Sequence, residues 1–214
     1  MPQQRQRLKP LVRLLFPLVR PLYRWILAHA EPDDPWAPST SWVPLAALGP
    51  GSEHSFAWYL EGETTVHPTT IEEMCDWLGG CVYQSDSELF HERDFWQHPK
   101  TFEHLRKGDC EDFALWAWRK LLELGIEARF FIGQRCSNKS VPWHAWVVLK
   151  HQGQQLLFEP QAPRDQMLVK FEDARDKYIP YFFVDRACKP VAVEGYLYYL
   201  KRRDLQRKPQ GHAT

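Results

Sequence analysis

The sequence lacks a net charge, and it lacks any long apolar run. Its 27 lysines and arginines equal its 27 aspartates and glutamates in number, over 214 residues. It therefore has no basic excess that would attract nucleic acid, and we expect no nucleic-acid partner. No stretch approaches the roughly 18 uninterrupted apolar residues that a transmembrane helix requires, because arginines and prolines break the apolar segment near the N-terminus. We expect no membrane-spanning helix.

Paired cysteine motifs are also missing. The five cysteines are an odd number at irregular spacings, which fits a disulfide framework poorly and favours a reducing, cytoplasmic compartment. No Cys-x-x-Cys pair or matching histidine pair stands at zinc-ligand spacing. His91, His98 and His104 fall in a polar stretch where solvated histidines are usual. We therefore predict no metal and no cofactor.

Residues 1–30 are strongly basic. They contain six basic residues and no acid, interleaved with leucine, valine and aromatic residues. This pattern predicts a basic amphipathic helix in peripheral contact with an anionic membrane surface. A helix packed on the domain is the alternative, since Pro17 and Pro21 weaken a continuous apolar face. Ala28-His29-Ala30 looks like a signal cleavage site, but no clean apolar core precedes it, so secretion is less favoured.

Prolines and hydrophobic periodicity predict the organisation of the remaining residues. The density of proline in residues 31–50 favours a linker, which leaves residues 51–214 as one domain. Helices are predicted from residue 69 to the Gly79-Gly80 pair and from residue 109 to Gly125. The predicted strands are residues 128–133, 143–150, 154–159 and 181–184. Helices followed by antiparallel strands indicate an α+β fold.

Cys110 is the first candidate for a chemical role. Gly108-Asp109-Cys110-Glu111-Asp112 places its thiol at the start of a helix, where unpaired N–H groups and the helix dipole favour a thiolate. Glu111 and Asp112 oppose that effect by like-charge repulsion, so activation needs an imidazole partner. Taken alone, a cysteine at this position is more often a small packed residue.

His144 and Glu159 are the candidate partners. Residues 143–149 form a predicted strand in which His144 shares a face with Trp146, and Glu159 ends the next strand. A two-residue turn at Gln152-Gly153 would make His144 and Glu159 diagonal neighbours on the same face of the sheet. An odd-length loop would place Glu159 on the opposite face. His144 could also be a buried histidine that a backbone carbonyl satisfies.

Four motifs in order resemble the transglutaminase-like superfamily. They are Gly-Asp-Cys-Glu-Asp at 108–112, Leu-Gly-Ile-Glu-Ala-Arg at 124–129, His-Ala-Trp-Val at 144–147 and Glu-Pro at 159–160. Asp-Phe-Trp-Gln-His-Pro at 94–99 is similar to the bacterial transglutaminase-like cysteine proteinase branch. The resemblance covers roughly residues 69–160 and implies a papain/transglutaminase-like core. Glu159 stands where that family usually has aspartate.

The resemblance implies a cysteine peptidase or amidase that acts on a protein or peptide. Cys110 would be the nucleophile, His144 the base and Glu159 the orienting carboxylate, with acyl transfer through a thioester. The Cys110 N–H and a side chain of Trp96 or Gln97 are the oxyanion candidates, and core packing is the alternative for Trp96. Hydrolysis is preferred over amine transfer. A non-catalytic binding or scaffolding module of the same fold is the competing hypothesis.

Overall fold

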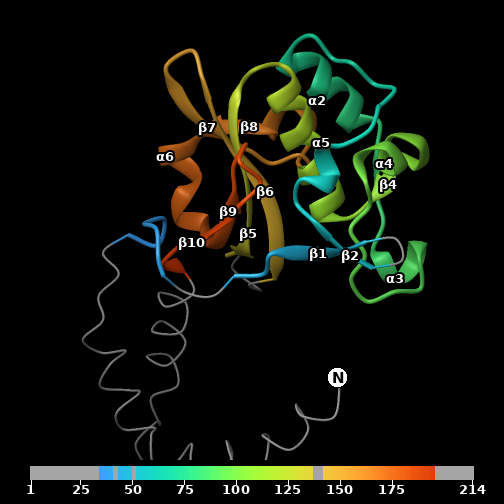
Figure 1. The fold of residues 1–214 in the computed structure, drawn as a ribbon. Helices are drawn as coiled ribbons and strands as arrows, with labels where there is room; N and C mark the ends of the chain where they lie inside the picture. The colour runs from blue at the N-terminus through green and yellow to red at the C-terminus, as the bar shows by residue number, and fades with distance from the viewer. Residues whose placement is uncertain (1–33, 41–42, 50–51, 137–141, 196–214) are drawn as a thin grey trace, which may run out of the picture.

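The computed structural model describes residues 34–40, 43–49, 52–136 and 142–195, which are coloured in Figure 1. The basic segment 1–30 lies outside these residues, so the amphipathic helix stays a prediction. Among the described helices, none is long and apolar enough to cross a bilayer. The five cysteines all lie in the described part and form no disulfide with one another.

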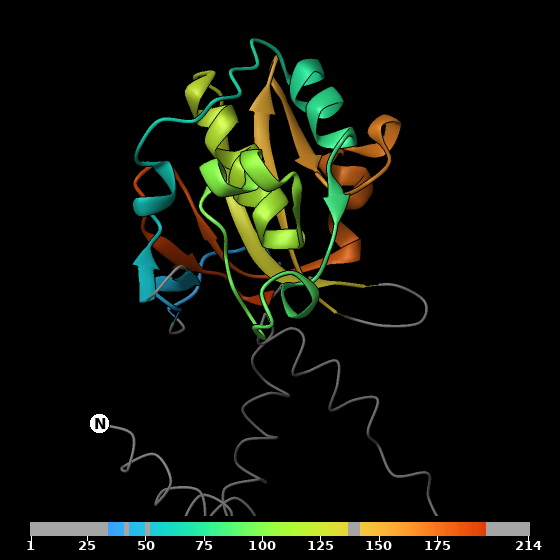
Figure 2. The same cartoon turned by 90° about the vertical axis from the view of Figure 1, so that its right-hand side faces the viewer.

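A six-stranded antiparallel sheet forms the centre of the molecule (Figures 1 and 2), and the predicted α+β fold is confirmed. Its strand order is β10-β9-β5-β6-β7-β8. The bounds are β5 (Glu127–Arg135), β6 (Trp143–His151), β7 (Gln154–Phe158), β8 (Leu168–Lys170), β9 (Tyr178–Val184) and β10 (Pro190–Ala192). Two small pairs lie outside it, β1 (Ala46–Gly49) with β2 (Ser52–Ser55), and β3 (Val82–Tyr83) with β4 (Lys107–Gly108).

The helices pack mainly on one face of the sheet (Figure 2). They are α2 (Ile71–Gly79), α3 (Asp86–Leu89), α4 (Pro99–Leu105), α5 (Cys110–Glu123) and α6 (Phe171–Ala174), with 3₁₀ turns η1 (Trp58–Leu60), η2 (Arg164–Gln166) and η3 (Arg175–Lys177). α5 lies against β5 and β6 and buries Trp116 and Trp118 in the larger hydrophobic core. α6 covers the opposite face, where Trp146 is the centre of a smaller core.

The turn between β6 and β7 fixes the register on which the site depends. Gln152 and Gly153 have positive φ angles of 50° and 76°, as a two-residue hairpin turn requires. His151 pairs with Gln154, and Val147 pairs with Phe158. The expected register is therefore present, and Glu159 continues on the same face as His144.

The proline-rich segment 31–50 is packed on the domain wherever the structure describes it. Trp36 makes edge contacts with Phe131, Trp146 and Phe171, and Pro38 forms a β-bridge with Val193. Residues 46–49 form β1. These contacts make residues 34–40 and 43–49 part of the folded unit rather than an extended linker.

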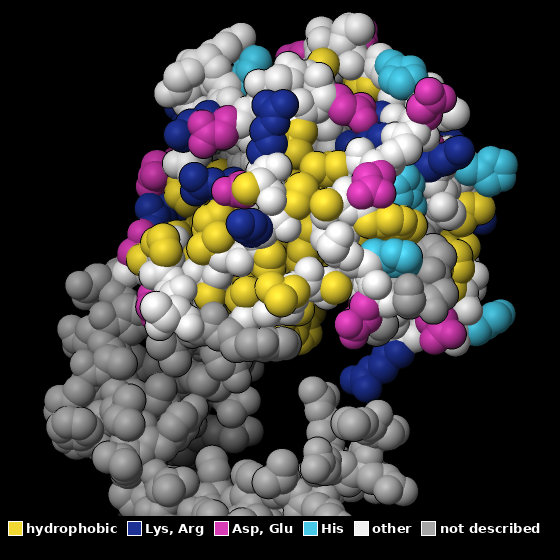
Figure 3. Space-filling view, in the orientation of Figure 1, with side chains coloured by type: hydrophobic (Ala, Val, Ile, Leu, Met, Phe, Trp, Pro, Cys, Tyr) yellow, Lys and Arg dark blue, Asp and Glu magenta, His cyan; other side chains and the backbone are white. Residues whose placement is uncertain are grey.

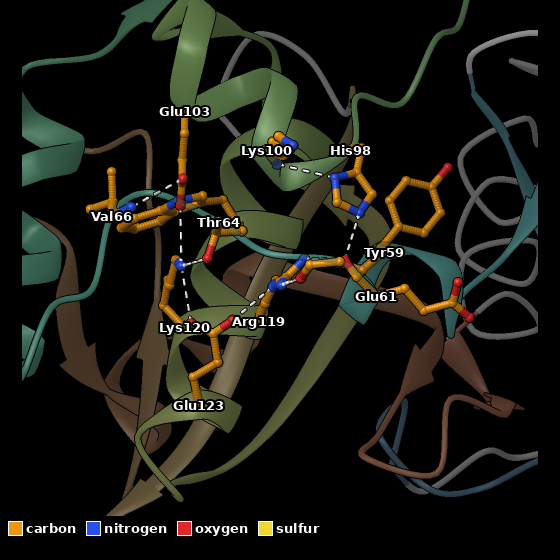
Figure 4. Close-up of polar contacts among 12 residues, drawn as sticks. Tyr59, Glu61, Thr64, Val66, His98, Lys100, Glu103, Arg119, Lys120 and Glu123 are labelled. Atoms are coloured by element: carbon orange, nitrogen blue, oxygen red, sulfur yellow. Dashed lines mark hydrogen bonds and ion pairs between the residues drawn. The ribbon is translucent and has the colours of Figure 1, made fainter.

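A buried ionic network joins residues 64–66, which precede α2, to α4 and α5 (Figure 4). Lys120 is fully buried, and its Nζ lies 3.1 Å from Glu103 Oε1 and 2.5 Å from Thr64 Oγ1. Glu103 also accepts hydrogen bonds from the N–H groups of Thr65 and Val66. Because a buried charge without partners is costly, this network fixes the position of α5 and so of its first residue.

Candidate active site

Cys110 is the first residue of α5, as the sequence predicts. Asp109 is the N-cap residue. Its side chain accepts a hydrogen bond from the backbone N–H of Asp112, and the Asp112 side chain accepts one from the backbone N–H of Asp109, which together form a capping box. Gly108 is required by close packing, because a Cβ there would collide with the Asp112 carboxylate and the Gln97 amide. The Gly-Asp-Cys-Glu-Asp motif is thus a helix start with a thiol at its first position.

The thiol of Cys110 faces acids. Its Sγ donates a hydrogen bond to Glu111 Oε2 at 3.2 Å. Burial raises the pKa of Cys110 well above its usual range, and the charges of Glu111 and Asp109 raise it further. The helix start alone therefore leaves the thiol protonated, and a base must take its proton during any reaction.

His144 and Glu159 make a direct side-chain contact. His144 Nε2 lies 2.7 Å from Glu159 Oε2, and both side chains are buried. The carboxylate of Glu159 also accepts a hydrogen bond from the Tyr178 hydroxyl at 2.9 Å. With Nε2 engaged in this way, Nδ1 is the imidazole nitrogen left for Cys110.

Cys110 and His144 open onto one cavity of about 960 Å³. Within the described residues no hydrogen bond joins the two side chains, because the thiol points to Glu111. Most of the cavity wall is apolar, and on the face drawn in Figure 3 hydrophobic side chains gather near the middle, where Figure 1 places β1 and β9. The apolar wall comprises Val43, Pro44, Ala46, Ala47, Phe56, Trp96, Ile132, Trp143, Tyr181 and Phe182.

The two oxyanion candidates lie in different environments. Trp96 lines the cavity beside Cys110, although its ring also packs on Phe56 and its Nε1 donates to Asp94. Gln97 is fully buried, and its amide nitrogen donates to Asp112 Oδ2 and to the Lys107 carbonyl. The amide N–H groups of Gln97 are thus engaged away from the cavity, and the oxyanion role stays a prediction.

Acids from three parts of the chain meet next to Cys110. Asp86, Asp109 and Asp112 form one group of potential ligands within 4.8 Å of one another, and Asp86, Asp94 and Glu111 form another. Asp86 is 3% exposed, and its Oδ1 has no hydrogen-bond partner among the described residues. Burial and the charge of Asp109 raise the pKa of Asp86 to about 7.

This acidic cluster was missed by the sequence analysis, which examined cysteine and histidine spacing. Burial together with neighbouring acids also raises the pKa values of Glu111 and Asp112 well above their usual range. A hard cation such as Ca²⁺ takes carboxylate oxygens as ligands. The Asp86 oxygen without a partner and the close grouping of carboxyl oxygens fit such an ion.

Comparison with known families identifies the core. Residues 56–158 match the model of the transglutaminase-like superfamily. These residues belong to that superfamily. The range includes Cys110 and His144, whereas Glu159 lies immediately after it. The predicted family is thereby confirmed, and the transglutaminase-like core is the unit formed by α2–α5 and β5–β7.

Two solved structures are similar to this chain. Legionella pneumophila LapG is similar at 20% identity and a TM-score of 0.45, covering 70% of this chain and 83% of LapG. A calcium-bound structure of LapG is similar at 19% identity and a TM-score of 0.44, covering 69% of this chain and 87% of that one. No curated protein sequence matches this chain.

Proposed function

We propose that this transglutaminase-like chain is a cysteine peptidase or amidase with Cys110, His144 and Glu159 as its triad. The observation that carries the proposal is the buried His144–Glu159 hydrogen bond at the wall of the cavity that Cys110 also lines. A carboxylate on one imidazole nitrogen leaves the other nitrogen free to act as a base toward the thiol. A binding or scaffolding module would have no need of this arrangement.

The reaction begins when the Cys110 thiol turns from Glu111 toward His144. His144 Nδ1 takes the thiol proton while sulfur forms a bond to the amide carbonyl carbon, and the carbonyl oxygen becomes an oxyanion near the N–H of Cys110. The C–N bond then breaks, and His144 returns the proton to the leaving amine. Water adds to the thioester with His144 as base, which releases the acid and restores the thiol.

The cavity also favours a class of substrate. Trp143 is 62% exposed, and its ring contacts Tyr181 at 4.7 Å edge to face on the apolar wall. An apolar side chain on the acyl part of a protein or peptide would bury apolar surface there, and no polar group would lose its hydrogen bonds. We therefore expect preference for large apolar residues on the acyl side.

Covalent labelling tests the proposal. The full chain would be treated with a peptide carrying an acyl-side phenylalanine and an electrophilic carbonyl, and the modified residue would be mapped by mass spectrometry. We expect Cys110 to be labelled far faster than Cys75, because Cys110 lines the cavity together with His144, which can take its proton, whereas Cys75 is buried in the hydrophobic core. Equal labelling of all the thiols would favour the non-catalytic module.

The acidic cluster fits a calcium ion, which Asp86 would hold either with Asp94 and Glu111 or with Asp109 and Asp112. When bound, such an ion offsets negative charge around Cys110 and so favours the thiolate. In the first arrangement, Glu111 would bind the ion and no longer accept the hydrogen bond of the Cys110 thiol. The thiol would be available to His144. The sequence-based expectation of no metal is replaced by this proposal.

We expect calcium to raise the melting temperature of the EDTA-treated chain. At one hundred times the dissociation constant, the shift should be about 5–10 °C for a protein of this size. Without calcium, stability should fall as the pH rises from about 4 to about 7, because the pKa of Asp86 is about 7 when folded and about 4 when unfolded, so the folded state holds more protons in that range. Scanning calorimetry at several pH values measures both effects.

The matched variants for that experiment are Asp86→Asn and Asp76→Asn. Asp76 is an exposed aspartate that pairs with Arg164, outside the cluster. Asp86→Asn should remove most of the calcium shift, and Asp76→Asn should retain it. A calcium shift that survives in Asp86→Asn would contradict the assignment of the site.

A further inference from the structure

Glu159 receives two hydrogen bonds on a single oxygen. Its Oε2 lies 2.7 Å from His144 Nε2 and 2.9 Å from the hydroxyl of Tyr178. All three side chains are buried, and Glu159 is only 3% exposed. A buried carboxylate requires donors, and Glu159 has its two donors on Oε2, since Oε1 has no hydrogen-bond partner among the described residues.

We propose that Tyr178 is a positioning residue that holds Glu159 in the geometry His144 needs. The proposal rests on the proposed triad and explains how a glutamate serves where the family usually has aspartate. Glutamate has one more rotatable bond, so its carboxylate can swing away from the imidazole. A second donor on Oε2 removes that freedom, because turning the carboxylate would break both hydrogen bonds together.

Tyr178 is itself held rigidly. It begins β9 opposite Arg135 of β5, and its ring packs on Trp146 at 4.9 Å. The Arg135 guanidinium lies 5.9 Å over that ring and 3.8 Å from Glu159 Oε2, so its charge also favours the carboxylate there. Side chains from three neighbouring strands, β5, β6 and β9, therefore lie around the same Glu159 oxygen.

Tyr178 remains a hydrogen-bond donor at every working pH. Burial raises its pKa above the usual range for tyrosine, and the negative charge of Glu159 raises it further, with Arg135 opposing. The groups that face it are thus Glu159, Arg135 and the imidazole of His144. The hydroxyl keeps its proton, so it can only donate to the Glu159 carboxylate.

The test is Tyr178→Phe in the full chain, which removes one hydroxyl and keeps the ring. The first measurement is the NMR resonance of the His144 Nε2 proton, which a short hydrogen bond protects from exchange with water. We expect this resonance in the wild type and its loss or broadening in Tyr178→Phe. The second is hydrolysis of N-acetyl-phenylalanine p-nitrophenyl ester, where kcat should fall about tenfold at an unchanged KM.

Tyr59→Phe is the matched control. Tyr59 is a fully buried tyrosine whose hydroxyl has no hydrogen-bond partner in the described residues, and it does not line the cavity. Its loss should leave both readouts unchanged. In the Glu159→Gln background, Tyr178→Phe should lower kcat little further, since the two residues act on His144 through the same contact.

Two results would overturn the role of Tyr178. One is a folded Tyr178→Phe protein with the wild-type His144 resonance and wild-type kcat. The other is a wild-type protein in which the protected proton is missing. If the resonance behaves as expected but the wild type hydrolyses no ester, Tyr178 does hold Glu159, and the proposed peptidase function is the part that fails.

Discussion

Replacement of Cys110 by alanine should reduce hydrolysis of N-acetyl-phenylalanine p-nitrophenyl ester to the uncatalysed rate, a loss of about 10⁴-fold or more. Alanine lacks the sulfur that forms the thioester, and no neighbouring group can replace it. The fold should persist, because alanine is smaller and suits the first turn of α5. Release of p-nitrophenolate measures the rate, and circular dichroism measures the fold.

Cys188→Ala provides the control for the loss of a thiol. Cys188 is half-buried, lies in the turn between β9 and β10, and does not line the cavity. Its replacement should leave the rate within about twofold of the wild type, as expected for a site outside the chemistry. Undiminished turnover in Cys110→Ala would show that the activity comes from another group, and the triad would have to be abandoned.

Glu159→Gln should lower kcat by about 10³-fold while the protein folds normally. The amide has the shape of the carboxylate but not its charge, so it cannot stabilise the protonated imidazole of His144, which lies 2.7 Å away. Glu159→Asp keeps the charge and shortens the reach, so we expect a loss of only about tenfold. Steady-state kinetics with the same ester measures both variants.

The control for Glu159 is Glu127→Gln on β5. Glu127 is exposed and forms surface ion pairs with Lys150 and Arg129, where such pairs contribute little. Its replacement should not change kcat. Equal activity of Glu159→Gln and the wild type would remove Glu159 from the triad, whatever contact it makes with His144.

Local signals explain which parts of this arrangement could be predicted. The helix beginning at Cys110 follows from its cap, and the His144–Glu159 neighbourhood follows from an even turn at Gln152-Gly153. Both depend on residues close in sequence, where capping and turn chemistry act. The fold class followed from the same kind of local pattern.

Other parts depend on contacts that no local pattern records. The start of β9 at Tyr178 was missed because Pro180 interrupts the strand pattern, and the structure places it where the β5–β9 register shifts. The acidic cluster joins residues 86, 94 and 109–112, which only tertiary packing brings together. The direction of the Cys110 thiol likewise depends on a side-chain contact, since the thiol donates its hydrogen bond to Glu111 rather than to His144.

The position of residues 43–47 bears on how short a fragment could be and still contain the whole cavity. The family core starts at residue 56, yet Val43, Pro44, Ala46 and Ala47 supply part of the cavity wall. Trp36 and Pro38 secure that wall to the sheet from the other side. A fragment trimmed to residues 56–158 would keep Cys110 and His144 but lose Glu159, Tyr178 and part of the cavity wall, so the length of the family match is shorter than the length of chain that the proposed triad needs.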